Sequence, residues 1–574
     1  MKKIFLLVAS AITLLTTPNY AQSPGWTNAF AMGAGDFDFC RGIGADNTGN
    51  IYIGGLFSAT IDFQPGPGIS YGASTGTIDF YIASYTNNGT LRWLRTMGGT
   101  GTSIDMGAVT TDANGNVYTT GYFLGSIDFD GTTGTDIHSS AAGAFDIFIT
   151  KYDSSGNYQF TLTFPGTSLF NKGEGISVDA TGAIYLCGYF SGVVDFDPGN
   201  GQATLTGAGL RDIFITKYSS TGTFQWVKQI GNADNQTAYD IATSNDGHLY
   251  LTGSYEGSLD FNPGPGISNF TTQGNTDIFI LKLDTAGNYI WNKRIGDTDI
   301  DEGQKIALGN NGELYVTGYF GWFTDFDPGS GTATLSSAGS DDIFILKLDT
   351  AGNYHWARSI GSSNLDEGVD IATGANGDVY TYAVFRDAAD VDPGTGTVTF
   401  TPIITGYSDL MLVCLDSTGT YKWAEQIGGD YNEYGGSICI TGTGAVWVSG
   451  DFFSPGFTLG TQNLLNIDPF GTANDIFFAR LGGSSTTQGF SETADQRNYE
   501  VYPNPASTEI HLKGLHPEQP AILTILDLAG KMVMETTTES RETVTLPLNA
   551  LQPGIYLLQI QQGTTKKPIK IVVQ

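Results

Sequence analysis

The chain has 574 residues, with 26 basic and 58 acidic side chains, and its formal net charge at pH 7 is −32. A surface this acidic repels nucleic acid and anionic lipid, so these partners are disfavoured, whereas cations and basic surfaces are permitted. Only four cysteines are present, scattered along the chain, which excludes a disulfide framework and a CxxC metal site.

The first 21 residues follow the order of a secretory signal peptide. Lys2 and Lys3 precede an apolar run from Ile4 to Leu15, and the small residue Ala21 stands before Gln22. The apolar run is too short to span a bilayer, and no later segment approaches membrane length. We therefore expect residues 1–21 to direct export to the periplasm and the mature chain to lack a transmembrane segment.

Residues 22–482 contain a repeat whose centre reads GNxYxxG. Its aromatic residue recurs seven times at intervals of 65 to 67 residues, as Tyr52, Tyr118, Tyr185, Tyr250, Tyr315, Tyr380 and Trp447. Each unit adds a short strand before this segment, an apolar strand such as DIFITKY (212–218) after it, and a last strand such as YIWNKRIG (289–296). Gly-rich turns join successive strands, which predicts one antiparallel four-stranded sheet per unit.

One copy of the aromatic last strand stands before the first complete unit. WTNAFAMG (26–33) precedes the first full unit, whereas the final apolar strand NDIFFARL (474–481) has no tryptophan strand behind it. An N-terminal strand that completes the seventh sheet closes a ring and removes the exposed sheet edges. The sequence therefore predicts an all-β fold with a seven-bladed β-propeller over 22–482. An open solenoid is the alternative, and it leaves Trp26 without a role.

The repeat resembles the SBBP-type bacterial propeller repeat. The GNxYxxG hairpin, the D-A/I-F-V/I strand and the G-x-x-x-W strand of that repeat are matched across most of the units. The resemblance implies the propeller fold. The units exceed the usual propeller repeat of about 40–45 residues, and most of the excess lies in the loop between the second and third strands.

That loop carries a DxDPG motif in several units, and we expect it on the same face of the ring as the loops between units. In one interpretation the aspartates accept backbone hydrogen bonds while proline and glycine shape a tight turn. In the other, paired carboxylates join acids of the neighbouring loops to bind Ca²⁺, which needs six to eight oxygens. The candidate ligands are Asp195, Asp197, Asp325, Asp327, Asp390 and Asp392. Both interpretations stay open, because the motif lacks the DxDxDG spacing.

Trp322, in YFGWFTDFDPG (319–329), is the one tryptophan outside a repeated strand position. It is a candidate aromatic platform for sugar binding, and filling a gap between sheets is the alternative. The histidines of the repeat region, His138, His248 and His355, occupy unrelated positions, so they indicate no metal triad or Ser-His-Asp set. A carboxylate pair for glycosidase or lyase chemistry stays open.

A polar Ser/Thr/Gly linker at 483–497 leads into residues 498–574, whose alternating pattern predicts a small Ig-like β-sandwich. Its diagnostic residues are Tyr502, Pro503, Asn504, Pro505, Gly530, Lys531, Pro553, Gly554, Tyr556 and Lys570. With these residues the segment closely resembles the type A C-terminal sorting domain of the type IX secretion system of Bacteroidetes. The resemblance implies that the secretion machinery reads the tail and that the linker is cleaved during export. An accessory domain that stays attached is the alternative.

These features predict a secreted or cell-surface module that binds an extracellular protein or glycan, or mediates adhesion, without catalysis. The main alternative is an extracellular Ca²⁺-dependent carbohydrate-active enzyme, a lyase or hydrolase that uses carboxylates of the loop face. A purely structural surface protein is the third interpretation. No cofactor other than Ca²⁺ is indicated.

Overall fold

Every regular element of the described chain is a β-strand, which confirms the all-β prediction. The computed structural model describes residues 21–573, with gaps at 35, 65–67, 100–102, 142, 469, 483–499, 504–505, 516–519, 527–531, 539–542, 549–550, 553 and 563–564. The signal peptide, apart from Ala21, and the linker at 483–497 lie outside the described residues. No helix that could span a membrane occurs in the part described. The chain divides into two compact units, residues 1–485 and 486–574.

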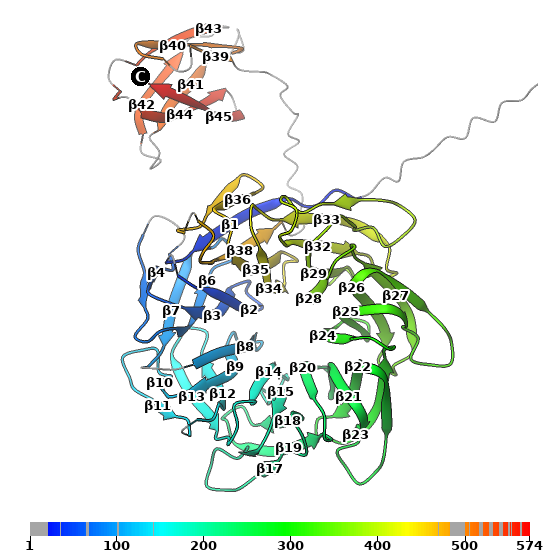
Figure 1. Cartoon of the computed structure of the whole chain (residues 1–574). Helices are drawn as coiled ribbons and strands as arrows, with labels where there is room; N and C mark the ends of the chain where they lie inside the picture. The colour runs from blue at the N-terminus through cyan, green and yellow to red at the C-terminus, as the bar shows by residue number, and fades with distance from the viewer. Residues whose placement is uncertain are drawn as a thin grey trace, which may run out of the picture. The chain divides into compact units, whose positions relative to one another are not determined.

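The described residues of the first unit form seven antiparallel four-stranded sheets arranged around a common centre (Figure 1). The first strands, nearest the centre, are β2 (Phe39–Ala45), β8 (Ser103–Thr111), β14 (Lys172–Val178), β20 (Gln236–Thr243), β24 (Glu302–Leu308), β28 (Glu367–Thr373) and β34 (Glu433–Ile440). The second strands are β3 (Ile51–Phe57), β9 (Val117–Leu124), β15 (Ile184–Phe190), β21 (His248–Asp260), β25 (Glu313–Asp325), β29 (Val379–Phe385) and β35 (Val446–Phe452).

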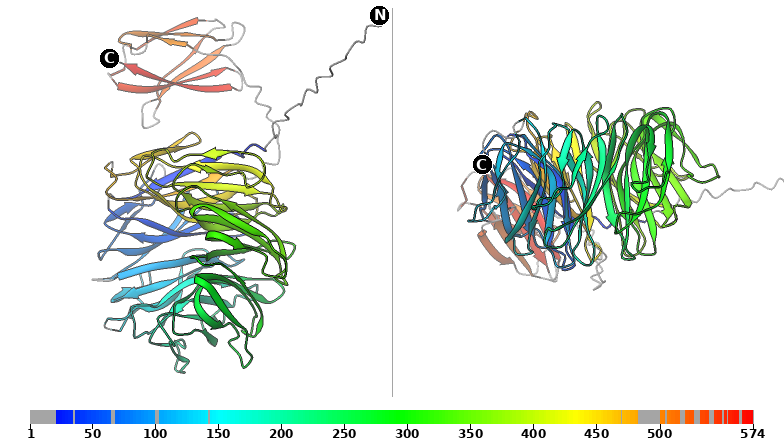
Figure 2. Two further views of the ribbon diagram at one scale, coloured as in Figure 1. Left: turned by 45° about the vertical axis from the view of Figure 1, so that its right-hand side comes forward. Right: turned by 90° about the horizontal axis from the view of Figure 1, so that it is seen from below.

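The third and fourth strands complete each sheet on its outer side. The third strands are β6 (Asp79–Tyr85), β12 (Asp146–Tyr152), β18 (Asp212–Tyr218), β22 (Asn269–Asp284), β26 (Thr334–Asp349), β32 (Asp409–Leu415) and β38 (Asp475–Leu481). The fourth strands are β7 (Leu91–Met97), β13 (Tyr158–Phe164), β19 (Phe224–Ile230), β23 (Tyr289–Ile295), β27 (Tyr354–Ile360), β33 (Tyr421–Ile427) and the N-terminal β1 (Trp26–Met32). Neighbouring sheets lie side by side in both further views (Figure 2).

The seventh sheet joins the two ends of the first unit. β1 pairs with β38, with Ala29 opposite Ala479 and Met32 opposite Ile476, as expected for the early copy of the aromatic strand. The first strand of each sheet contacts that of the next, and β34 of the seventh sheet contacts β2 of the first.

Neighbouring sheets are linked by a repeated polar contact. The Nζ of Lys282 and the Nε1 of Trp291 donate to the carbonyl of Thr350 in the following sheet, at 2.9 and 3.3 Å. The same pair of donors recurs at Thr285 and at Ser417. Each lysine also lies over the central tyrosine of its own unit, as Lys282 does at 4.9 Å from the Tyr250 ring centroid. The repeated aromatic and lysine positions therefore hold the sheets to one another.

The long loops between second and third strands form hairpins at the outer margin (Figure 1). Their short strands are β4 (Thr60–Asp62), β5 (Tyr71–Ala73), β10 (Ser126–Asp128), β11 (Ile137–Ser139), β16 (Val193–Asp195), β17 (Thr204–Thr206), β30 (Ala389–Asp390), β31 (Thr399–Phe400), β36 (Gly456–Leu459) and β37 (Gln462–Leu465). In the fourth sheet the ends of the long strands β21 and β22 form the hairpin, and in the fifth sheet the ends of β25 and β26 form it.

The hairpins contact the loops between units, as the expectation of a shared face requires: the amide of Val193 donates to the hydroxyl of Thr167, in the loop after β13, at 2.9 Å. The phenylalanine inside the DxDPG motif anchors the hairpin, because its side chain is fully buried, as at Phe129 and Phe196. Its carbonyl accepts the hydroxyl of a third-strand tyrosine, as Phe196 does from Tyr218 at 2.8 Å. Val194 of the third hairpin also forms an isolated β-bridge with Gly166, which follows the fourth strand of the preceding sheet.

The second unit contains two antiparallel sheets. One consists of β39 (Glu500–Tyr502), β40 (Glu509–Lys513) and β43 (Thr543–Pro547), and the other of β42 (Met532–Thr538), β41 (Ala521–Leu526), β44 (Gly554–Gln562) and β45 (Thr565–Val573). Ile510 and Leu512 of the first sheet share one buried cluster with Leu523, Leu558 and Ile571 of the second. The two sheets therefore enclose a core of their own.

Candidate functional site

The first aspartate of each DxDPG motif binds two backbone N–H groups of its own hairpin. Oδ1 of Asp195 accepts the amides of Asp197 and Ala203 at 3.2 and 2.8 Å. Equivalent contacts join Asp325 to Asp327 and Ala333 at 3.1 and 2.8 Å, and Asp390 to Asp392 and Val398 at 3.2 and 2.9 Å. One carboxylate oxygen thus ties the two ends of the turn together in every case.

The second aspartate of the motif accepts the backbone amide of the glycine two residues later. Oδ1 of Asp197 accepts the amide of Gly199 at 2.9 Å, and Asp327 and Asp392 do the same at 2.8 Å. In the fourth unit Asn262 stands at this position and accepts the amide of Gly264 at 2.9 Å, so a neutral amide serves as well. These contacts support the turn interpretation. The Ca²⁺ interpretation of the six aspartates stays a prediction.

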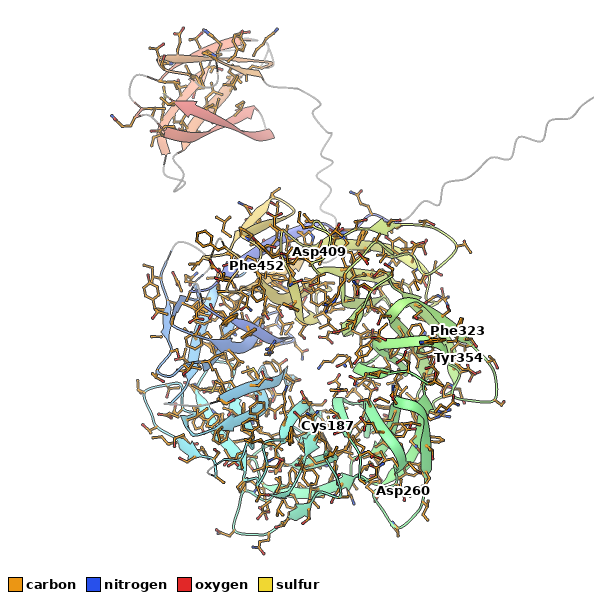
Figure 3. All side chains as sticks on the ribbon, in the orientation of Figure 1. Cys187, Asp260, Phe323, Tyr354, Asp409 and Phe452 are labelled. Atoms are coloured by element: carbon orange, nitrogen blue, oxygen red, sulfur yellow. The ribbon has the colours of Figure 1, made fainter. Side chains whose placement is uncertain are left out.

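The hairpins hold these carboxylates apart. Asp260, the first aspartate of the fourth hairpin, lies at the outer margin (Figure 3). Three of the loop acids that were candidate partners, Asp301, Asp366 and Glu433, are fully buried at the starts of first strands. The other four, Asp105, Glu174, Glu302 and Glu367, are half-buried in the first strands. Across the described ranges, no three His, Cys, Asp or Glu side chains gather as a group that could hold a metal ion.

Trp322 lies on the surface, in backbone that normally takes glycine. Its φ is +45°, and Gly192 and Gly257 hold the equivalent bend in other sheets with φ of +70° and +73°. The ladder between β25 and β26 shifts register between Gly321 and Phe323, which leaves Trp322 unpaired in the bulge. A left-handed conformation is unfavourable for a bulky residue and persists only where the surroundings enforce it.

The Trp322 side chain is 62% exposed, and that of Phe323 is 65% exposed. Phe323 lies at the outer margin of the ring (Figure 3). No hydrogen-bond partner of the Trp322 indole N–H occurs among the described residues. The indole N–H groups of Trp26, Trp93, Trp226, Trp291, Trp356 and Trp447 all have one. This exposure favours the platform interpretation over the filling of a gap between sheets.

Carboxylates of the preceding loop hold the backbone on both sides of Trp322. Oδ2 of Asp297 accepts the amide of Phe323 at 3.0 Å, and Oδ1 of Asp301 accepts the amide of Gly321 at 3.3 Å. Burial raises the pKa of Asp301 to about 7 against the opposing effect of its backbone hydrogen bonds. These contacts enforce the unusual conformation of Trp322.

The centre of the first unit contains a polar cavity of about 350 Å³ that the sequence analysis did not predict. All seven first strands carry a β-bulge, and the charged residues at or next to it, Arg41, Asp240, Lys305 and Asp370, line the cavity. The sequence signal was a charged residue directly before the apolar end of a first strand, as Lys305 in EGQKIAL (302–308).

The charges near this cavity are largely paired with one another. Arg41 contacts Asp105 at 3.3 Å, and Lys172 contacts Asp105 and Glu174 at 2.9 and 3.2 Å. Lys305 lies 3.8 Å from Asp240. Although burial opposes it, the charges of Asp240 and Asp370 raise the pKa of Lys305. This arrangement leaves little uncompensated charge for a ligand.

The sorting residues are only partly within the described chain. Tyr502 ends β39 and its ring centroid lies 5.4 Å from that of His511, while Pro503 follows in a bend. The hydroxyl of Tyr556 donates to the Gln552 carbonyl at 2.9 Å, Gly554 begins β44, and Lys570 lies in β45. The remaining five, Asn504, Pro505, Gly530, Lys531 and Pro553, lie outside the described residues.

Residues 500–574 match the family described as "Secretion system C-terminal sorting domain". This confirms the sorting domain that the tail motifs indicated. The domain implies export by the type IX secretion system, contact with its machinery, and a secreted or cell-surface location.

The chain is similar to parts of two longer proteins. It is 27% identical over 223 residues to the regulatory protein FlaEY of Caulobacter vibrioides, which covers 37% of this chain and 22% of that protein. It is 25% identical over 418 residues to an uncharacterized WD repeat-containing protein of Acanthamoeba polyphaga mimivirus, covering 60% of this chain and 30% of that protein. The chain thus spans less than a third of either relative.

Among solved structures, Sqt1 from Chaetomium thermophilum is similar over 75% of this chain and 97% of its own, with 9% identity and a TM-score of 0.32. A TM-score of this size supports no argument about function.

Proposed function

We propose that the first unit is a closed seven-bladed β-propeller over 22–482, followed by a linker at 483–497 and a small Ig-like sandwich at 498–574. The pairing of β1 with β38 and the contact of β34 with β2 support closure. The similarity to a WD repeat-containing protein also supports it, because WD repeats form propeller blades. The signal peptide at 1–21 and the SBBP resemblance stay predictions that fit this architecture.

We further propose that the propeller is a non-catalytic binding or adhesion module that the tail delivers to the outside of the cell. The observation that carries this proposal is the exposed pair Trp322 and Phe323, held in a strained bulge. Contiguous exposed apolar side chains mark interaction sites, and backbone strain clusters at functional sites. The DxDPG carboxylates bind backbone amides and the cavity charges bind one another, so neither set favours catalysis.

The test is binding of the purified chain, residues 22–574, to immobilised glycan and peptide arrays. We expect saturable binding to at least one ligand class, weakened about fivefold or more by Trp322→Ala. Ile267→Ala, which truncates another exposed apolar side chain on a different hairpin, is the matched control. Binding that ignores Trp322, or the shortening of a bound polysaccharide, would overturn the proposal.

A further inference from the structure

Two carboxylates border the exposed aromatic pair. Asp299 lies against Gly321, the residue before Trp322, and its Oδ2 is 3.2 Å from the point where a Cβ on Gly321 would stand. Asp341 is the ladder partner of Gly321 across β25 and β26. Both aspartates are half-buried. The backbone of Trp322 therefore lies next to two acidic residues.

These carboxylates have no basic partner within the described chain. Oδ1 of Asp299 accepts the amide of Ile300 at 3.1 Å, and no donor to the Asp341 side chain occurs there. Burial raises the pKa of Asp341, and the charge of Asp299 adds to this effect. Glu367 and Asp342, the other titratable groups that interact with Asp341, are also acidic. The negative charge beside Trp322 is uncompensated.

A cation with an alkyl stem fits this combination. Ammonium and guanidinium groups are attracted to the face of an aromatic ring, best of all to tryptophan, and they form charge-assisted hydrogen bonds with carboxylates. The stem of a lysine or arginine side chain packs on apolar surface, which Phe323 and the 40% exposed Ile300 provide. A neutral sugar also stacks on tryptophan but leaves both charges uncompensated.

We propose that Trp322, Phe323, Asp299 and Asp341 form a docking surface for lysine or arginine side chains of a basic polypeptide segment. This inference rests on the proposed binding function and names its partner class. The net charge of −32 supports it, because a strongly acidic protein attracts basic partners from a distance.

The test follows the Trp322 resonance of the 5-fluorotryptophan-labelled chain, residues 22–574, assigned with Trp322→Phe. The probes are an acetylated, amidated tetralysine peptide and, separately, cellohexaose. We expect tetralysine to shift this resonance saturably and cellohexaose to leave it unchanged. The double variant Asp299→Asn with Asp341→Asn weakens tetralysine binding about fivefold or more.

The matched control carries Asp130→Asn with Asp197→Asn, which removes the same charge from the hairpins of the second and third sheets. Asn262 occupies this position naturally in the hairpin of the fourth sheet, so the change preserves the turn. We expect the control to bind tetralysine within about twofold of the unaltered chain. The inference fails if tetralysine leaves the Trp322 resonance unmoved or if both double variants weaken binding equally. A response to cellohexaose alone also overturns it, but that result keeps the proposed binding function.

Discussion

At the scale of single residues, Asp325 distinguishes a turn-forming carboxylate from an ion ligand. Its Oδ1 accepts two backbone amides, from Asp327 and Ala333. Asp325→Ala removes this acceptor, so we expect the free energy of unfolding to fall by about 1–3 kcal/mol. Asp325→Asn keeps an acceptor oxygen, and a smaller loss is expected. Urea denaturation with and without Ca²⁺ measures both. Equal losses, or a Ca²⁺-dependent stabilisation that disappears in the asparagine variant, would contradict the turn interpretation.

Trp322 gives a second prediction, about backbone strain. Its φ of +45° suits glycine and disfavours any residue with a Cβ. We therefore expect Trp322→Gly to be more stable than Trp322→Ala by about 1 kcal/mol, because only glycine relieves the strain. Thermal unfolding compares the two. Ala59, with φ of +56°, is the control, since Ala59→Gly relieves similar strain without removing an aromatic ring. Equal stability of the Trp322 variants would show that the bulge is unstrained.

At the scale of elements, the contact between neighbouring sheets depends on Lys282. Its Nζ donates to the Thr350 carbonyl and lies over the Tyr250 ring. We expect Lys282→Met to lower the free energy of unfolding by about 1–2 kcal/mol, since both contacts are lost. Lys293→Met is the control, because the Lys293 Nζ makes no hydrogen bond within the described chain and lies 5.9 Å from the Trp291 ring centroid. Similar losses for the two variants in chemical denaturation would rule out the inter-sheet contact as the cause.

The strands could be predicted from the sequence because the repeat marks both their spacing and their turns. Gly115, Gly182 and Gly312 follow the turn residues in the pattern and adopt φ of +76° to +80°. The position of the hairpins at the outer margin could not be predicted, because it depends on which side chains bury Phe129 and Phe196. The cavity charges were also missed. A β-bulge changes which side chains face the centre, and bulges depend on pairing register rather than on local sequence.

Trp322 illustrates the same limit at the candidate site. It was identifiable because it interrupts the repeat, at a bend where Gly192 and Gly257 stand in other units. Its exposure and its acidic border depend on contacts between the loop at 297–301 and β25, which are 20 or more residues apart in the chain. The local pattern around Trp322 does not contain that information.

At the scale of the whole molecule, buried carboxyl groups set the dependence of stability on pH. Burial raises the pKa of Asp38 and of Glu433 to about 8, and that of Asp475 to about 6. Unfolded carboxyl groups titrate near pH 4. The stability that these groups contribute is therefore complete below about pH 4 and is lost as the pH rises through about 6 to 8.

Other carboxylates contribute stability at higher pH and lose this contribution in acid. Although desolvation opposes it, hydrogen bonds lower the pKa of Asp46, Asp179 and Asp416, so their contribution is present above about pH 4 and is lost in acid. We expect the melting temperature to be highest between about pH 4 and 6 and to be lower at about pH 8. Calorimetry across this range measures it. A melting temperature that stays constant or rises towards pH 8 would contradict the account.

A single substitution tests the cause of this decline. Glu433 stands where Gln236 occurs in another sheet, and it is fully buried. We expect Glu433→Gln to reduce the loss of melting temperature between about pH 5 and 8, because glutamine need not ionise. Asp234→Asn, at an exposed position, is the control and should leave the loss unchanged. If the melting temperatures of both variants fall between about pH 5 and 8 as much as that of the unaltered chain, Glu433 does not cause the pH dependence.

The central claim is that the two ends of the repeat region meet in one sheet, and a designed disulfide tests it most directly. Ala29 of β1 lies opposite Ala479 of β38. Directly paired strand residues come close enough for a disulfide. The four native cysteines are free, and three of them are buried. We expect Ala29→Cys with Ala479→Cys to form an intramolecular disulfide that peptide mass spectrometry detects, whereas Ala29→Cys with Ala357→Cys forms none. Free thiols at both positions, or cross-links only between molecules, would contradict closure by the N-terminal strand.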